Sequence, residues 1–283
     1  MKIAKTIRSV RKLVRQARSK GKSVGLVPTM GALHQGHISL IEKAAKDSDF
    51  VVVSIFVNPT QFGPKEDFKK YPRPVQDDLN ACRKAGADLV FAPSAKQMYP
   101  RQNLAWVSVE KLSELLCGRF RPGHFRGVAT VCTKLFNIVQ PDLAFFGQKD
   151  AQQAIIIKRL VADLNFPLKI IVCPTVREKT GLAMSSRNYY LTPQEKIDAA
   201  CLYKSLRKAK QMVAAGIIDA QKIIAQMRKI ITAAASAKIE YIEIVDAKTL
   251  CPIKKIDRPV LVALAVRIGR TRLIDNIIID SQK

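Results

Sequence analysis

Two histidines three residues apart are the most distinctive chemical feature of this 283-residue chain. His34 and His37 end the run Pro28–His37, which follows a short apolar segment, 24–27, and precedes an amphipathic helix predicted to begin near Ile38. The first N–H groups of a helix lack intrahelical partners and the helix dipole is positive there, so this position suits an anion. Residues spaced i and i+3 lie on one helix face, so both imidazoles would add donors at the same point. The pattern predicts a site that binds a phosphoryl group and stabilises charge developing on it.

Chance and ordinary surface roles are the alternatives for this pair, because two histidines at this spacing carry no chemistry by themselves. The setting after a strand and a Gly-containing turn, at a helix start, favours phosphate binding. The run has neither the Gly spacing of a dinucleotide fingerprint nor the GxxxxGK(S/T) pattern of a phosphate loop. The sequence therefore predicts a nucleotide-phosphate site of another kind.

The elements that must position this loop alternate between strands and helices through the first half of the chain. Apolar runs rich in β-branched residues predict strands at 24–27, 50–57, 88–91, 142–146 and 168–172. Amphipathic patterns predict helices at 4–20, 75–85, 125–139 and 150–163, besides the one that follows His37. Such alternation is typical of a parallel sheet with helices on both faces, so we predict an α/β, Rossmann-like, doubly wound domain.

Three predicted loops follow the carboxyl ends of strands, where open parallel sheets bind their ligands. They are the loop with the two histidines, the segment 58–63 and the segment 147–153. We expect them to meet in one cleft although they are far apart in sequence.

Cations and hydroxyl groups for a polyphosphate are present in one of these loops and in a polar segment at 176–188. Lys149 and Arg187 offer positive charge, and Ser185 and Ser186 offer hydroxyl donors. Ordinary surface positions are the alternative for all four, because the chain has 48 Lys and Arg residues.

Several other polar residues could have either a structural or a functional role. Gln61 and Gln153 carry carboxamides that donate and accept, which suits a small substrate with hydroxyl and carboxylate groups, but either could be a solvated loop residue. Asp77 and Asp78 begin a predicted helix, where the dipole favours carboxylates and where one of them could contact Mg²⁺. His124 fits a structural role at a helix start.

The pattern of the chain changes near residue 175. Beyond the polar segment, Thr192, Pro193 and Glu195 form the capping box of a helix start. Two long helices within 193–235 and several strand-like runs follow. We therefore predict a Rossmann-like nucleotide-binding domain at 1–175 and a smaller C-terminal α/β domain at 176–283 that covers the active site.

The composition limits the class of protein. The net charge is +25, but Lys and Arg are spread along the chain and aromatic residues make up only 6%, which argues against a nucleic-acid partner. No apolar run approaches the ~20 residues of a membrane span. Six scattered cysteines without a CxxC pair predict reduced thiols in a cytoplasmic protein.

Five ordered motifs resemble the pantothenate synthetase (pantoate–β-alanine ligase) family, and the likeness extends to Arg272–Asn276. The motifs are Pro28–His37, Phe56–Phe62, Arg121–Thr130, Phe146–Gln153 and Ala183–Asn188. This family belongs to the nucleotidylyltransferase-like superfamily, whose His-x-x-His loop at a helix start is matched by the two histidines.

The resemblance implies an ATP-dependent ligation of pantoate and β-alanine to pantothenate, a precursor of coenzyme A. The carboxylate of pantoate would attack the α-phosphate of ATP, giving pantoyl adenylate and pyrophosphate, and the amine of β-alanine would then displace AMP. Catalysis of the first step would rest on positioning and electrostatic stabilisation. The resemblance also implies Mg²⁺ with ATP and a homodimer.

The same resemblance assigns roles around the nucleotide. His34, His37 and Lys149 would be catalytic, with His37 as the proton donor. Asp150 would bind the ribose, while Lys149 and Ser185–Arg187 would bind the β- and γ-phosphates. The residues implied to line the ATP site are Met30, Gly31, Ala32, Leu33, His34, Gln35, Gly36, His37, Gly147, Gln148, Lys149, Asp150, Val176, Met184, Ser185, Ser186 and Arg187.

The remaining implied roles concern the acid substrate and the metal. Gln61 and Gln153 would bind pantoate, with Gln61 also near the β-alanine position, and Asp77 would be the Mg²⁺ ligand. The chain departs from the commonest family pattern at Gln148, where Glu or Arg is usual, and at Thr180, where Asp is usual. Neither position has a chemical role that we can name.

Two rival functions remain at this point. Another nucleotidylyltransferase of the same fold would release a nucleotide product instead of an amide, and Gln61 and Gln153 argue against it. A basic nucleic-acid-binding protein would show salt-dependent affinity for a duplex or a single strand.

Overall fold

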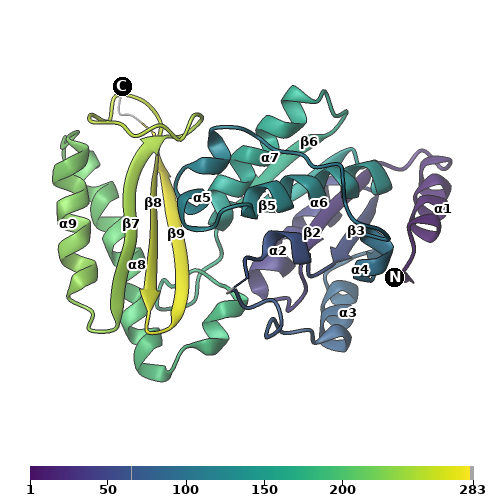
Figure 1. Ribbon diagram of the computed structural model, residues 1–283, viewed down its shortest axis with the longest axis horizontal. Helices are drawn as coiled ribbons and strands as arrows, with labels where there is room; N and C mark the ends of the chain where they lie inside the picture. Colours follow the sequence, from purple (N-terminus) through teal and green to yellow (C-terminus); the bar gives the residue numbers. More distant parts are fainter. Residues whose placement is uncertain (65, 281–283) are drawn as a thin grey trace. The chain divides into compact units, whose positions relative to one another are not determined.

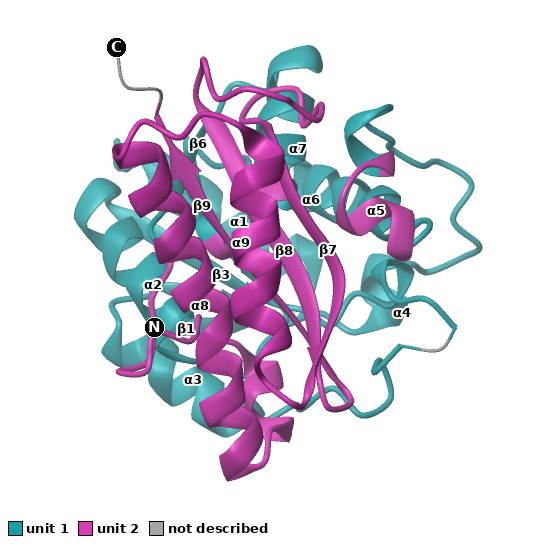
Figure 2. Ribbon diagram, turned by 90° about the vertical axis from the view of Figure 1, so that its left-hand side faces the viewer, with its two compact units in different colours: residues 1–113, 121–148, 153–174 teal, residues 114–120, 149–152, 175–283 magenta. Residues whose placement is uncertain are grey.

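The computed structural model describes residues 1–64 and 66–280, and its chain forms two compact units (Figures 1 and 2). Unit 1 comprises Met1–Ser113, Arg121–Gln148 and Gln153–Pro174, and unit 2 comprises Glu114–Phe120, Lys149–Gln152 and Thr175–Lys283. Two short segments of the predicted first domain therefore belong to unit 2.

A six-stranded parallel sheet forms the centre of unit 1, with the order β1-β4-β3-β2-β5-β6. The strands are β1 (Lys2–Ala4), β2 (Val24–Thr29), β3 (Phe50–Ile55), β4 (Leu89–Phe91), β5 (Leu143–Gly147) and β6 (Lys169–Cys173). The chain runs outward from β2 to β3 and β4, then returns to the other side of β2 for β5 and β6. The loops after β2 and β5 thus flank the switch point, where open sheets bind ligands.

Alternate residues of these strands enter two separate apolar cores, one on each face of the sheet. Leu26 packs in the core that includes side chains of α1, α6 and α7, whereas Val27 packs in the core that includes α2 and α3. The helices of unit 1 are α1 (Ile7–Arg18), α2 (Gln35–Asp47), α3 (Val75–Lys84), α4 (Ala95–Met98), α6 (His124–Val139) and α7 (Ala151–Asp163), whose first two residues fall in unit 2. The short helix α5 (Cys117–Phe120) belongs to unit 2. The predicted doubly wound α/β class is confirmed.

Two predicted helix starts differ from the structure. The helix predicted at 4–20 begins only at Ile7, because Thr6 caps it by accepting the Ser9 N–H at 3.2 Å. The three residues of β1 before it are too short to give a strand pattern. The next helix, α2, begins at Gln35 and not near Ile38, because the side chain of His34 acts as its cap.

Unit 2 contains a three-stranded antiparallel sheet, β7 (Ala237–Asp246), β8 (Val260–Ile268) and β9 (Thr271–Ile279). Helices α8 (Pro193–Ala214) and α9 (Ala220–Thr232) share one apolar core with it, and Figure 1 shows them beside the sheet. The predicted capping box at the start of α8 is confirmed, since Thr192 and Glu195 each accept the other's backbone N–H. Among the described residues, no helix has the length and apolar character to cross a bilayer.

Candidate active site

The residues predicted for the site divide between the two units. Unit 1 contains Met30–His37, Gln61, Asp77, Gly147, Gln148 and Gln153. Unit 2 contains Lys149, Asp150, Val176 and Met184–Arg187.

Both imidazoles of the histidine loop cap the N-terminus of α2. The Gly36 N–H donates to Nδ1 of His34 at 3.1 Å, and the His34 N–H donates to Nδ1 of His37 at 3.4 Å. The ring centroids are 4.1 Å apart. Because each Nδ1 accepts a hydrogen bond from a backbone N–H, a neutral ring carries its own proton on Nε2. The loop thus adds two Nε2–H donors to a helix N-terminus, the arrangement expected for an anion site.

The buried carboxylate of Asp78, which the sequence placed only at a helix start or beside Mg²⁺, shapes this loop. Asp78 is 2% exposed and accepts the N–H groups of Ala32 and Leu33 at 2.9 and 2.7 Å. Burial raises its pKa, and the two backbone donors oppose that effect only in part. Gly31 has φ +81°, and a Cβ there would lie 2.8 Å from Asp78 Oδ2. The neighbouring Asp77 is exposed.

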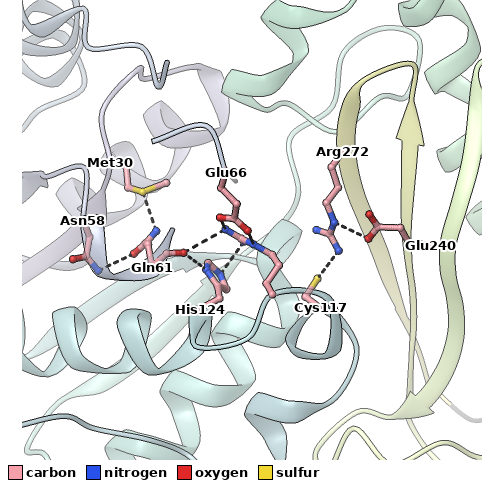
Figure 3. A network of polar contacts seen from close by, with 9 residues as sticks. Met30, Asn58, Gln61, Glu66, Cys117, His124, Glu240 and Arg272 are labelled. Atoms are coloured by element: carbon pink, nitrogen blue, oxygen red, sulfur yellow. Dashed lines mark hydrogen bonds and ion pairs between the residues drawn. The ribbon is translucent and has the colours of Figure 1, made fainter. Parts of the chain in front are cut away.

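Gln61 lies in a short 3₁₀ turn, Pro59–Gln61, in the loop that follows β3, and its side chain contacts Met30 at the start of the histidine loop. Its Nε2 lies 2.9 Å from the sulfur of Met30, and Asn58 Nδ2 donates to its Oε1 at 3.2 Å (Figure 3). The residue is 9% exposed. The structure therefore brings together two of the loops that we expected to converge.

A charged network fixes the backbone of Gln61 (Figure 3). His124 Nδ1 lies 2.8 Å from the Gln61 carbonyl oxygen, and Arg121 Nη1 lies 3.0 Å from His124 Nε2. A carbonyl can only accept and a guanidinium can only donate, so this geometry requires a neutral His124 with its proton on Nδ1. Arg121 also forms two bonds with Glu66, at 2.7 and 2.6 Å. The structural role of His124 is thus to hold the backbone of Gln61 in place.

The pairing of Glu66 with Arg121 predicts a loss of stability in acid. Burial pushes the pKa of Glu66 upward, but the hydrogen bonds and charge of Arg121 outweigh it and hold the pKa below its ordinary value of 4.5. A lowered folded-state pKa stabilises the protein above the unfolded-state pKa, and this contribution disappears as the pH falls through the folded-state pKa. We expect the free energy of unfolding to fall less steeply below pH 4.5 in Glu66→Gln than in the unmodified protein. Denaturant titrations across pH measure this, and an equal effect of Glu42→Gln, at an exposed carboxyl, would contradict it.

A close backbone approach also holds Gln61. A Cβ at Gly127, in α6, would lie 2.3 Å from the Thr60 carbonyl oxygen and 2.8 Å from Gln61 Cα. We expect Gly127→Ala to destabilise the protein by about 1–3 kcal/mol, because backbone atoms must move to admit the methyl group. At Gly63 the nearest atom to such a Cβ is 3.7 Å away, so Gly63→Ala is the matched control in thermal or denaturant unfolding. Equal stabilities of the two variants would contradict the argument.

In unit 2, the predicted phosphate-binding residues lie on two short segments. Lys149 and Asp150 occupy a 3₁₀ turn, with Nζ of Lys149 3.5 Å from Oδ1 of Asp150. The second segment is a hairpin in which the Met184 N–H donates to the Val176 carbonyl oxygen at 3.0 Å. After it, Ser185 Oγ accepts the Arg187 N–H at 3.3 Å and caps the turn Ser186–Tyr190.

A second polar network in Figure 3 belongs to unit 2 and contains a motif residue. Arg272, on β9, lies 2.8 Å from Glu240 and 3.6 Å from the sulfur of Cys117. The same sulfur lies 3.1 Å from the hydroxyl of Tyr241. These contacts attach the segment Glu114–Phe120 to the antiparallel sheet.

The chain is similar to known proteins over nearly its whole length. The family model for pantoate-beta-alanine ligase matches residues 2–278. Pantothenate synthetase from Moorella thermoacetica is 54% identical over 280 residues, covering 99% of each chain, and that from Acetivibrio thermocellus is 52% identical, covering 99% of this chain and all of the relative. The crystal structure of pantothenate synthetase from Thermus thermophilus has a TM-score of 0.93 at 41% identity, covering 98% of this chain and 99% of that one.

One similar structure was solved with small molecules bound. The pantoate-beta-alanine ligase from Francisella tularensis, complexed with beta-gamma ATP and beta-alanine, has a TM-score of 0.81 at 38% identity and covers 98% of this chain and 97% of that chain. Sequence, family model and fold agree over nearly the full length. The chain therefore belongs to the pantoate–β-alanine ligase family and is an enzyme of that kind.

Proposed function

We propose that the enzyme joins pantoate to β-alanine in two steps, using ATP and releasing AMP and pyrophosphate. The observation that carries the proposal is the N-terminus of α2, where backbone N–H groups and two Nε2–H donors form an anion site. The Francisella relative with ATP and β-alanine supports the choice of ligands.

In the first proposed step, an oxygen of the pantoate carboxylate attacks the α-phosphorus of ATP. The bond to the bridging oxygen breaks, pyrophosphate leaves, and a mixed anhydride, pantoyl adenylate, forms. Negative charge grows on the phosphate oxygens, and His34 and His37 stabilise it by donating hydrogen bonds from Nε2. His37 is the proposed proton donor to the leaving pyrophosphate.

In the second proposed step, the amine of β-alanine attacks the acyl carbon of the adenylate. The carbon–oxygen bond to AMP breaks, and the nitrogen loses a proton as the amide forms. Gln61 and Gln153 bind the pantoate portion, and the network of His124, Arg121 and Glu66 keeps Gln61 in place. Holding both reactants in line supplies much of the rate enhancement.

The unit 2 segments have proposed roles toward the nucleotide. Lys149 and the Ser185–Arg187 turn bind the β- and γ-phosphates, and Asp150 binds the ribose. In the described part of the chain, no group of three or more His, Cys, Asp or Glu side chains is arranged to hold a metal ion. Mg²⁺ binds through one or two carboxylates together with phosphates, so the exposed Asp77 fits that donor set. The ion would neutralise phosphate charge.

Isotope transfer tests the two-step proposal directly. With ¹⁸O in its carboxylate, pantoate should pass one labelled oxygen to AMP, because the bridging oxygen of the adenylate stays with phosphorus when the amine attacks carbon. Mass spectrometry of AMP detects the label. Label found only in pantothenate and pyrophosphate would contradict the adenylate.

Replacing either glutamine is expected to weaken the use of pantoate more than that of ATP. For Gln61→Ala or Gln153→Ala we expect KM for pantoate to rise about tenfold, because a hydrogen-bonding group is lost, with a much smaller change in KM for ATP. Steady-state kinetics with each substrate varied in turn measures both. Equal increases for pantoate and ATP would contradict direct contact with pantoate.

The homodimer and the cytoplasmic location stay predictions from family resemblance and composition. Sedimentation of the purified protein tests the first.

A further inference from the structure

We propose that two adjacent residues of β9, Asp275 and Asn276, are positioning residues for the ATP-binding segments of unit 2. The inference rests on the proposed function of those segments. It also gives a role to two residues of the Arg272–Asn276 motif, to which the proposed reaction steps assign none.

The two side chains point to opposite faces of β9, because side chains alternate along a strand. Asp275 lies on the same face as Leu273 and Ile279, which pack in the core with α8 and α9. Asn276 lies on the other face, together with Arg272. One short stretch of strand can therefore hold two different segments.

Asn276 holds the segment that carries Lys149. Its Nδ2 donates to the Lys149 carbonyl oxygen at 2.9 Å, and the residue is 5% exposed. A buried amide that donates to a backbone carbonyl fixes the position of that peptide. The bond fixes the point at which the side chain of Lys149 leaves the backbone. The proposed role of Asn276 therefore requires no direct contact between Asn276 and phosphate.

Asp275 holds the hairpin that leads into Met184–Arg187. Arg177 donates to both of its oxygens, Nη1 at 2.6 Å and Nη2 at 3.0 Å, and Asp275 is 2% exposed. Arg177 Nη1 also donates to the Gly181 carbonyl oxygen at 3.0 Å. Its guanidinium lies over the ring of Tyr203, with Cζ 3.8 Å from the ring centroid. Such a bidentate pair fixes both distance and orientation.

The aspartate also orders the strand itself. Oδ1 of Asp275 accepts the N–H of Asn276 at 2.8 Å, so the aspartate side chain and the asparagine backbone are linked. The hairpin that Asp275 holds through Arg177 is closed by the β-bridge between Arg177 and Ala183. A disturbance at this point of β9 should therefore reach both segments.

The decisive variant is Asn276→Ala, studied with Lys149→Met and the double variant. We expect Asn276→Ala to raise KM for ATP about five- to tenfold, the loss typical of one buried hydrogen bond, with KM for pantoate within twofold. When Lys149→Met is already present, adding Asn276→Ala should have little further effect on KM for ATP, because the lysine side chain that Asn276 positions is gone. A merely structural role would give additive effects and would raise both KM values.

Hydrogen exchange supplies a readout that needs no substrate. Asn276→Ala should speed exchange at residues 149–152, and Asp275→Asn should speed exchange at 176–188. Asn137→Ala is the matched control, since its amide donates to the Thr133 carbonyl oxygen on the exposed side of α6, at 3.0 Å. If Asn276→Ala or Asp275→Asn does not fold, Asn276→Ser and Arg177→Lys take their places.

The outcomes separate this inference from the proposed function. Unchanged KM for ATP in Asn276→Ala, while Lys149→Met raises it, would overturn the positioning role and leave the proposed function intact. Unmodified protein that makes no pantothenate from ATP, pantoate and β-alanine would overturn the proposed function and with it the ATP role of this pair. Unchanged exchange in both variants would overturn the anchoring itself.

Discussion

His37→Ala should slow the formation of pantoyl adenylate about 10²–10³-fold, the loss typical of one donor aimed at developing transition-state charge. His37 caps α2 through Nδ1, which directs the remaining proton of a neutral ring to Nε2. Rapid-quench measurement of pyrophosphate release in a single turnover isolates this step. Circular dichroism and thermal unfolding of the variant check that the fold is retained.

Two conservative replacements separate the cap from the catalytic donor. His37→Asn can keep an acceptor near the Nδ1 position but has no donor at the Nε2 position. His37→Gln can place an amide donor near Nε2. We therefore expect His37→Gln to retain more adenylation activity than His37→Asn. The reverse order would show that capping of the helix, and not donation to phosphate, explains the loss in the alanine variant.

Lys149→Met should lower the adenylation rate about 10²-fold, because a cation proposed to contact the β- and γ-phosphates is removed. The side chain is 20% exposed, so solvent can replace its charge only in part. Pyrophosphate release with ATP varied at saturating pantoate measures the effect. Lys149→Arg should recover part of the rate, since it keeps the charge but changes the geometry of the donors.

An overall loss of positive charge is the competing explanation for that result. The chain has a net charge of +25, which attracts anionic substrates at long range. Lys179→Met removes one charge at an exposed position of the same unit and is the matched control. A similar loss in both variants, abolished at high ionic strength, would assign the effect to general attraction and not to contact with ATP.

The sequence predicted the sheet and its helices well, because buried parallel strands and amphipathic helices give strong local patterns. It placed the start of α2 too late, since histidine is an unusual cap and the side chain of His34 replaces the Ser, Thr, Asp or Asn expected there. It chose Asp77 for Mg²⁺ and gave Asp78 no contact with the histidine loop, although only Asp78 shares the buried side of α3 with Cys82. The four-residue spacing of Asp78 and Cys82 could have shown that both lie on the buried face of the helix.

Long-range hydrogen bonds account for what the sequence could not predict. Arg121 pairs with Glu66, 55 residues away, and Asn276 donates to Lys149, 127 residues away. No local pattern encodes such partners, because each depends on how the whole unit folds. The motif Arg272–Asn276 was visible as a family resemblance, but its contacts required the structure.

In the proposed mechanism, pantoate is activated by adenylation before β-alanine reacts. Pyrophosphate and AMP release by the unmodified enzyme, measured with each substrate omitted in turn, tests this order of events. We predict that a burst of pyrophosphate requires ATP and pantoate but not β-alanine, and that turnover to AMP requires all three. Release of ADP and phosphate, or pyrophosphate formed without pantoate, would contradict the account.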